Sequence, residues 1–161
     1  MAGNVLRQLL RGQGAHTDPV AVLADLSAEV VGLRLPQVEH TIWQQVVHMN
    51  YWMDYEIRSI EGPEPSYPEH AAASWPERDA PQGGREWETE RKRFEELVAH
   101  LERLAEADER TLSRIVHPKK RETALEVVWQ MAAHNSYHIG QVALLRRAFG
   151  RWPPPGGGDS W

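Results

Sequence analysis

Apolar residues recur at helical spacing along most of the chain. From Ile42 to about Ile60 they repeat every three or four positions, as on one face of an α-helix. The ranges 85–107 and 122–150 carry stripes of the same kind, and a fourth helical stretch covers 3–31. No stretch alternates convincingly between apolar and polar residues. The pattern therefore predicts an all-α protein without β-strands.

Several helix ends carry recognisable sequence signals. Thr41 followed by Gln44 has the form of a capping box, in which each side chain hydrogen-bonds to the backbone of the other residue. Gly150 is placed to end the last helix behind two arginines. The first stretch is interrupted by the glycines of 12–14, and we expect it to restart at 17–19, where a proline follows an aspartate.

The connection between the second and third helices is long and rich in proline. The range 62–84 holds five of the eleven prolines and shows no apolar periodicity. Long connections in compact domains are usually functional loops or crossovers, and a crossover would let the second and third helices run parallel. Four amphipathic helices of about twenty residues predict one four-helix-bundle domain over 1–161, with a proline- and glycine-rich tail at 151–161.

Composition narrows the classes of function. The chain has 18 Lys and Arg against 23 Asp and Glu, and the basic residues are scattered, which argues against a nucleic-acid-binding face. It has no cysteine, so disulfides, thiolate zinc sites and a cysteine nucleophile are excluded. It also lacks the long apolar segment of a signal peptide or a membrane span. We expect a cytoplasmic protein that does not bind membranes and acts on a small molecule.

Two histidines lie four positions apart in the apolar run MAAHNSYHIGQVALLRR, residues 131–147. His134 and His138 share the apolar stripe of the last helix, so their Cβ atoms should lie about 5–6 Å apart. They are either core histidines bonded to neighbours or ligands of one metal ion. His48, beside the apolar stripe of the second helix, would complete a site of three nitrogens, because metal sites in bundles are built from facing helices.

The other five histidines are expected to be solvated or capping residues. They are His16, His40, His70, His100 and His117. His16 and His40 could also approach a cleft at the end of the bundle.

The motifs HTIWQQVVHMNYW and MAAHNSYHIGQVALLRR together resemble the DinB/YfiT-like family of metal-binding bundles. The resemblance implies up-down-down-up helix order and a homodimer. It also implies one divalent metal ion, zinc or nickel, on His48, His134 and His138. Members are described as metal-dependent hydrolases, and some relatives use a low-molecular-weight thiol in S-transfer.

The chemistry of such a site depends on the groups beside it. Asn135 occupies the place of the glutamate base in the H-E-x-x-H motif of metalloproteases, so a hydrolase would need metal-bound water or a carboxylate such as Asp54 or Glu56. We expect those two to be solvated. Three neutral imidazoles leave the ion its +2 charge, which deprotonates a coordinating thiol. We therefore favour thiol-dependent S-transfer through a metal-bound thiolate, with a metal-dependent hydrolase or a non-catalytic, stress-related metal-binding bundle as alternatives.

Other residues are candidates for roles near the metal ligands or the substrate. Trp52 follows His48 by one turn, Tyr137 adjoins His138, and Gln141 lies one turn beyond it. For Trp52 we favour core packing over a role at the site, and for Tyr137 packing or a surface position is the alternative. The loop around Trp75 and the tail are candidates for covering the site.

Overall fold

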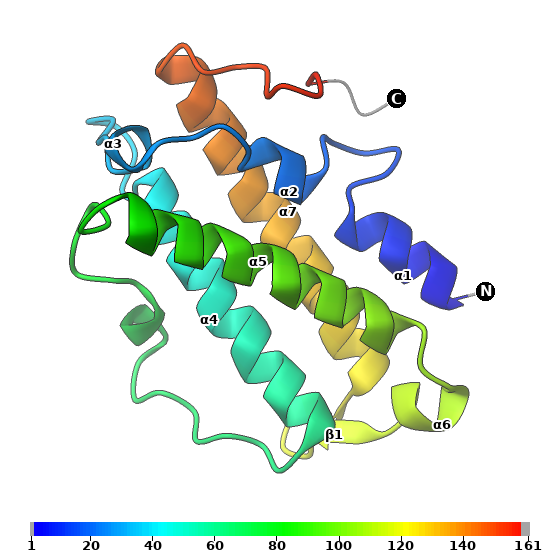
Figure 1. Ribbon diagram of the computed structural model, residues 1–161. Coiled ribbons are helices and arrows are strands. Elements are labelled where there is room, and N and C mark those ends of the chain that lie inside the picture. Colours follow the sequence, from blue (N-terminus) through cyan, green and yellow to red (C-terminus); the bar gives the residue numbers. More distant parts are fainter. Residues whose placement is uncertain (1, 159–161) are drawn as a thin grey trace.

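Four helices pack side by side in the computed structural model, which describes residues 2–158 (Figure 1). They are α1 (Ala2–Leu10), α4 (Ile42–Glu61), α5 (Gly84–Ala105) and α7 (Ala124–Ala148). Short elements lie between them: α2 (Pro19–Val22), α3 (Ala28–Val31), the 3-10 turn η1 (Ala71–Ser74), α6 (Glu109–Leu112), β1 (Ile115–His117) and β2 (Glu122–Thr123). The prediction of a four-helix bundle is confirmed.

Helices α4 and α5 run in the same direction. Asn50 in the first half of α4 hydrogen-bonds to Glu90 in the first half of α5, and Glu61 at the end of α4 bonds to His100 in the second half of α5. The segment between them therefore crosses back along the bundle, as its length predicted. Figure 1 shows α1 and α7 running in the opposite direction, which is the up-down-down-up order.

The helix ends follow local capping chemistry. The Thr41 hydroxyl accepts from the Gln44 amide at 3.2 Å, and the Gln44 side chain accepts from the Thr41 amide at 3.0 Å, so the predicted capping box is present. Helix α7 begins at Ala124 instead of 122, because Thr123 and Glu126 form a second capping box there.

Two sequence expectations about the fold were wrong. The range 3–31 is not a helix with one break, and its first helix has only nine residues; the glycines at 12 and 14 have φ of 67° and 74°, left-handed values that favour glycine. The chain is also not free of strands, since β1 and β2 pair antiparallel. Strands of three and two residues are too short to show an alternating pattern.

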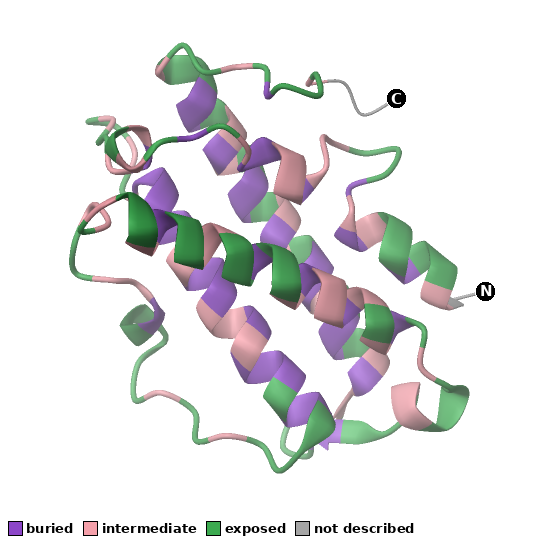
Figure 2. Ribbon diagram, in the orientation of Figure 1, coloured by how far each residue is buried: buried purple, intermediate pink, exposed green. Residues whose placement is uncertain are grey.

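The apolar stripes of the four helices meet in one core (Figure 2). Fully buried residues come from α4, α5 and α7, as shown by Met49, Phe94 and Val142, each 0% exposed. Within residues 2–158 no helix is both long enough and apolar enough to cross a membrane.

Candidate metal centre

The structure brings the three predicted histidines together between α4 and α7. One ring nitrogen from each of His48, His134 and His138 lies within 4.8 Å of the others. Nε2 of His48 is 3.1 Å from Nε2 of His134. Two nitrogens bound to one ion at about 2.0–2.1 Å lie roughly 3–4 Å apart, so this pair fits a shared ion.

A glutamine fixes the orientation of the His138 ring. His138 Nδ1 lies 2.5 Å from Oε1 of Gln45, one turn before His48 on α4. The Gln45 amide nitrogen donates to Oε1 of Gln141 at 2.5 Å, so its oxygen faces the histidine. With the Gln45 amide in this orientation, His138 Nδ1 carries the proton, which leaves a lone pair on Nε2 for a metal.

A serine from the crossover fixes the orientation of the His48 ring. Its Nδ1 lies 2.8 Å from Oγ of Ser74, and that hydroxyl donates to the carbonyl of Ala71 at 2.7 Å. Because the hydroxyl proton is already used, Ser74 accepts from His48 Nδ1, and Nε2 again offers a lone pair. Two of the three histidines are thus held in the tautomer that a metal site needs.

The third histidine, His134, has no such hydrogen bond among the described residues to orient its ring. Nδ1 of His134 is buried without a hydrogen-bond partner in the described structure, and its Nε2 faces His48. The three donors are neutral imidazoles, which are ligands for several divalent metals, among them zinc, copper, iron and nickel. The residues present therefore fit a divalent metal ion.

Burial and mutual repulsion keep these rings uncharged. Burial, followed by the neighbouring histidines, lowers the pKa of His48 to about 3 and that of His138 to about 4. Burial also lowers the pKa of His134. At neutral pH all three rings are in the unprotonated form that binds metals.

A cleft of about 720 Å³ reaches this cluster through His138. His40 and Trp75 form part of its wall, and the Trp75 ring is stacked between those of His40 and His48. Among the described residues no lysine or arginine lines the cleft; its one acidic residue is Glu39.

Of the three other candidate residues, two lie at the cleft and one lies elsewhere. Gln141 lines the cleft and bonds to Gln45, while Tyr137 stands at its edge with 68% of its surface exposed. Trp52 packs instead in an aromatic cluster with Tyr55 and Tyr67.

Sequence reasoning missed Gln45 and Ser74. The position of Gln45, three residues before His48 and so on the same helix face, was the signal that could have found it.

The carboxylates considered as bases do not line the cleft. Asp54 lies 3.6 Å from both Arg58 and Arg93. The expectation that Glu56 and His117 are solvated was wrong, because they are 9% and 6% exposed and bond at 2.6 Å.

His117 also bonds to Glu64 at 2.8 Å through its other nitrogen, so the ring carries both protons. Burial opposes this charge, but the two carboxylates outweigh it and raise the pKa of His117. For Glu56, burial raises the pKa of the carboxyl, and the contact with His117 offsets only part of that effect.

Two further histidines bond to residues distant in sequence. His100 bonds to Glu61 on the surface, and His16 bonds to Ser136 at 2.8 Å. Of the two expected near a cleft, His40 lines the one at the metal centre, and His16 lines a separate cavity.

Asn135, at the position of a metalloprotease base, is buried against Met53. The three-histidine cluster in a four-helix bundle is the geometry that the resemblance implied. A family model of the DinB superfamily matches residues 14–142. The chain belongs to the DinB superfamily. No curated protein and no solved structure matches it. This DinB domain therefore has a buried three-histidine cluster able to bind a divalent metal.

Proposed function

We propose that this DinB protein is a metal-dependent enzyme that transfers a small molecule to or from the sulfur of a low-molecular-weight thiol. The observation that carries the proposal is the cleft that opens onto His138 beside the other two histidines. Structural zinc is normally closed by four protein ligands, whereas a site of three protein ligands has room for an external one. A bound zinc or nickel ion would lower the pKa of a coordinating thiol.

The chain's own residues would have binding and orienting roles. His48, His134 and His138 would hold the ion, while Gln45 and Ser74 keep two of the rings in the required tautomer. The sulfur must come from the cosubstrate, because the chain has no cysteine.

The surroundings of the cleft favour S-transfer over hydrolysis. A hydrolase with a protein base would need a carboxylate at the cleft, and Asp54 and Glu56 are engaged with other residues. Glu39 lines the cleft, but its side chain is 87% exposed. A thiol that has lost its proton is itself a nucleophile, so that step asks for no carboxylate base.

The test is the absorption spectrum of cobalt-substituted protein. We expect new charge-transfer bands when small thiols are added, and loss of this response together with weaker metal retention in His138→Ala. His100→Ala, which removes a surface histidine paired with Glu61, is the matched control and should respond as the wild type does. A cobalt spectrum that no thiol changes would support the non-catalytic alternative.

The apo protein should stay helical under the same conditions. The apolar stripes bury a continuous core without a metal, so an ion should add only the mass-action stabilisation of binding. Circular dichroism of metal-stripped protein measures this, and unfolding at room temperature would favour a structural ion.

We also propose a homodimer. Trp129, Tyr137 and Leu144 are each more than half exposed on α7, at positions that fall on one helix face. No Asp, Glu, Lys or Arg lies between 127 and 145. An uncharged helix face with exposed aromatic side chains suits burial against a second copy. Light scattering that gives the monomer mass at micromolar protein would exclude it.

A further inference from the structure

The crossover between α4 and α5 returns to the metal centre at two adjacent residues. Ser74 is 3% exposed and holds His48 through the hydrogen bond described above. The ring of Trp75 lies 3.7 Å from that of His48 and 3.6 Å from that of His40, with planes inclined by only 7° and 10°. One side of the His48 ring is therefore covered by the crossover.

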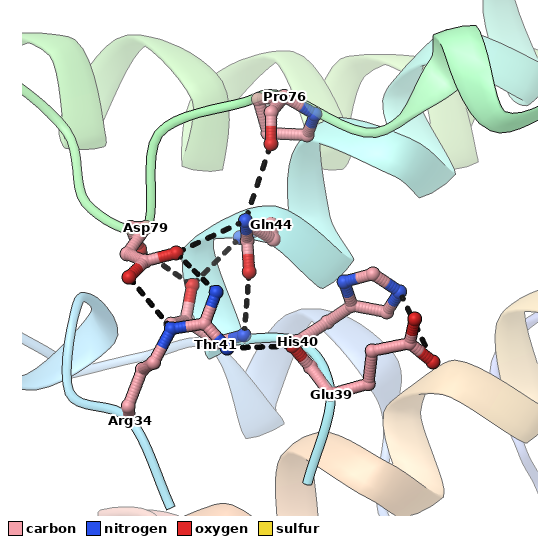
Figure 3. A network of polar contacts seen from close by, with 7 residues as sticks. All are labelled: Arg34, Glu39, His40, Thr41, Gln44, Pro76 and Asp79. Carbon is pink, nitrogen blue, oxygen red and sulfur yellow. Dashed lines mark hydrogen bonds and ion pairs between the residues drawn. The ribbon is translucent and has the colours of Figure 1, made fainter.

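A few residues later, the same segment forms hydrogen bonds to the start of α4 (Figure 3). The Gln44 side chain donates to the carbonyl of Pro76 at 3.1 Å, and the Thr41 hydroxyl donates to that of Asp79 at 2.6 Å. The guanidinium of Arg34 binds both carboxylate oxygens of Asp79, at 2.5 and 2.6 Å. The capping box of α4 thus also docks the crossover.

These contacts restrict both the position of the ring proton of His48 and the rotation of its ring. A neutral histidine exchanges its proton between two ring nitrogens, and only the form with the proton on Nδ1 offers Nε2 to an ion. Ser74 selects that form, and the flat face of Trp75 limits rotation of the ring. A histidine side chain whose orientation is fixed beforehand loses less conformational entropy when the metal ion binds.

We propose that Ser74 and Trp75 are positioning residues for His48, and that the position of the segment 71–79 is coupled to metal binding. This inference rests on the metal site of the proposed function. Coupling is reciprocal, so if the docked segment strengthens metal binding, the metal must strengthen docking of the segment by the same factor.

The first measurement is made on metal-free protein. Nitrogen-15 NMR of the histidine rings should show the Nδ1–H form of His48 in the wild type and a mixture of tautomers in Ser74→Ala. Ser74→Thr keeps a hydroxyl and should restore the single form. Ser66→Ala removes an exposed serine of the same crossover and should leave the spectrum unchanged. An unaltered His48 tautomer in Ser74→Ala would overturn the positioning role.

The second measurement tests the coupling. Zinc affinity should fall about 10–100-fold in Ser74→Ala and in Trp75→Leu, the range found when groups that orient metal ligands are removed. Zinc should slow amide hydrogen exchange at 71–79 in the wild type and do so less in Trp75→Leu. Wild-type affinity in both variants, or exchange at 71–79 that is indifferent to zinc, would refute the coupling.

These outcomes separate the inference from the proposed function. If zinc protects the segment but no thiol alters the cobalt spectrum, S-transfer fails and the positioning role stands. If thiols alter the spectrum but His48 keeps its Nδ1–H form in Ser74→Ala, the positioning role fails alone. A wild type that binds neither zinc nor cobalt overturns both.

Discussion

Arg146 offers a direct test of how the fold is held together. Its side chain is fully buried in α7, two turns beyond His138. The guanidinium donates to the carbonyls of Val22 and Ala24, each at 2.8 Å, to that of Arg151 at 2.8 Å, and to the Asp25 carboxylate at 2.9 Å. One side chain thus ties the turn after α2 and the start of the tail to the last helix.

We expect Arg146→Met to destabilise the protein strongly. Methionine keeps much of the buried volume but donates no hydrogen bond, so carbonyls that face the guanidinium lose their partner. Breaking a buried charged interaction by removing one partner costs about 3–5 kcal/mol. For a domain of this size, about 2–4 °C of melting temperature is lost per kcal/mol, which gives a fall of roughly 6–20 °C.

The assay is urea denaturation of the metal-free protein followed by circular dichroism. Arg147→Met is the matched control, because the neighbouring guanidinium is exposed and stacks over Trp152 at 3.9 Å. An exposed cation–π contact is worth about 0.5–1 kcal/mol, so this variant should change little. If Arg146→Met stayed within 1 kcal/mol of the wild type, the reasoning about its buried hydrogen bonds would be refuted.

Three further predictions concern the site and the other end of the bundle. Gln45→Leu removes the acceptor for His138 and should weaken zinc binding about 10–100-fold by calorimetry, while Gln130→Leu should not; equal affinities would contradict the role given to Gln45. The pKa of His117 is raised in the folded protein, so its stabilisation is full below the unfolded pKa of about 6.5 and is lost as pH rises through the folded value. Urea denaturation should therefore show the wild type losing more stability than His117→Gln between pH 6 and pH 9, and parallel losses would argue against the charged pair. Within the described part of the chain no lysine or arginine lines the cleft, and Glu39 lies at its wall. Cobalt protein should therefore bind mercaptoethanol more tightly than mercaptosuccinate at equal thiolate concentration, and the reverse order would contradict this reasoning.

The parts of the structure that depend on neighbours in sequence were predicted well. The four-residue spacing of His134 and His138 places them on one face of a helix, whatever the rest of the chain does. The capping box at Thr41 is likewise a local arrangement. The proline-rich crossover follows from length and composition, and it makes α4 and α5 parallel.

Interactions between distant residues could not be predicted in the same way. Gln45 and His138 are 93 positions apart, and their contact depends on the relative register of two antiparallel helices. Ser74 reaches His48 because a 3-10 turn brings it there, and no periodicity marks that turn. Glu56 was expected to be solvated because a charge on a helix is usually exposed; its burial depends on His117, 61 positions away.

The charges around the metal centre connect the structure to the proposed chemistry. The groups that hold or cover the three histidines are neutral: the amides of Gln45 and Gln141, the hydroxyl of Ser74 and the indole of Trp75. None of the described carboxylates hydrogen-bonds to these histidines, unlike the arrangement in many zinc sites where an acidic residue does so. A divalent ion held here would therefore keep its charge largely uncompensated by the protein. An anionic external ligand would offset part of that charge, and a thiolate would do so while bringing the nucleophile that the cysteine-free chain lacks.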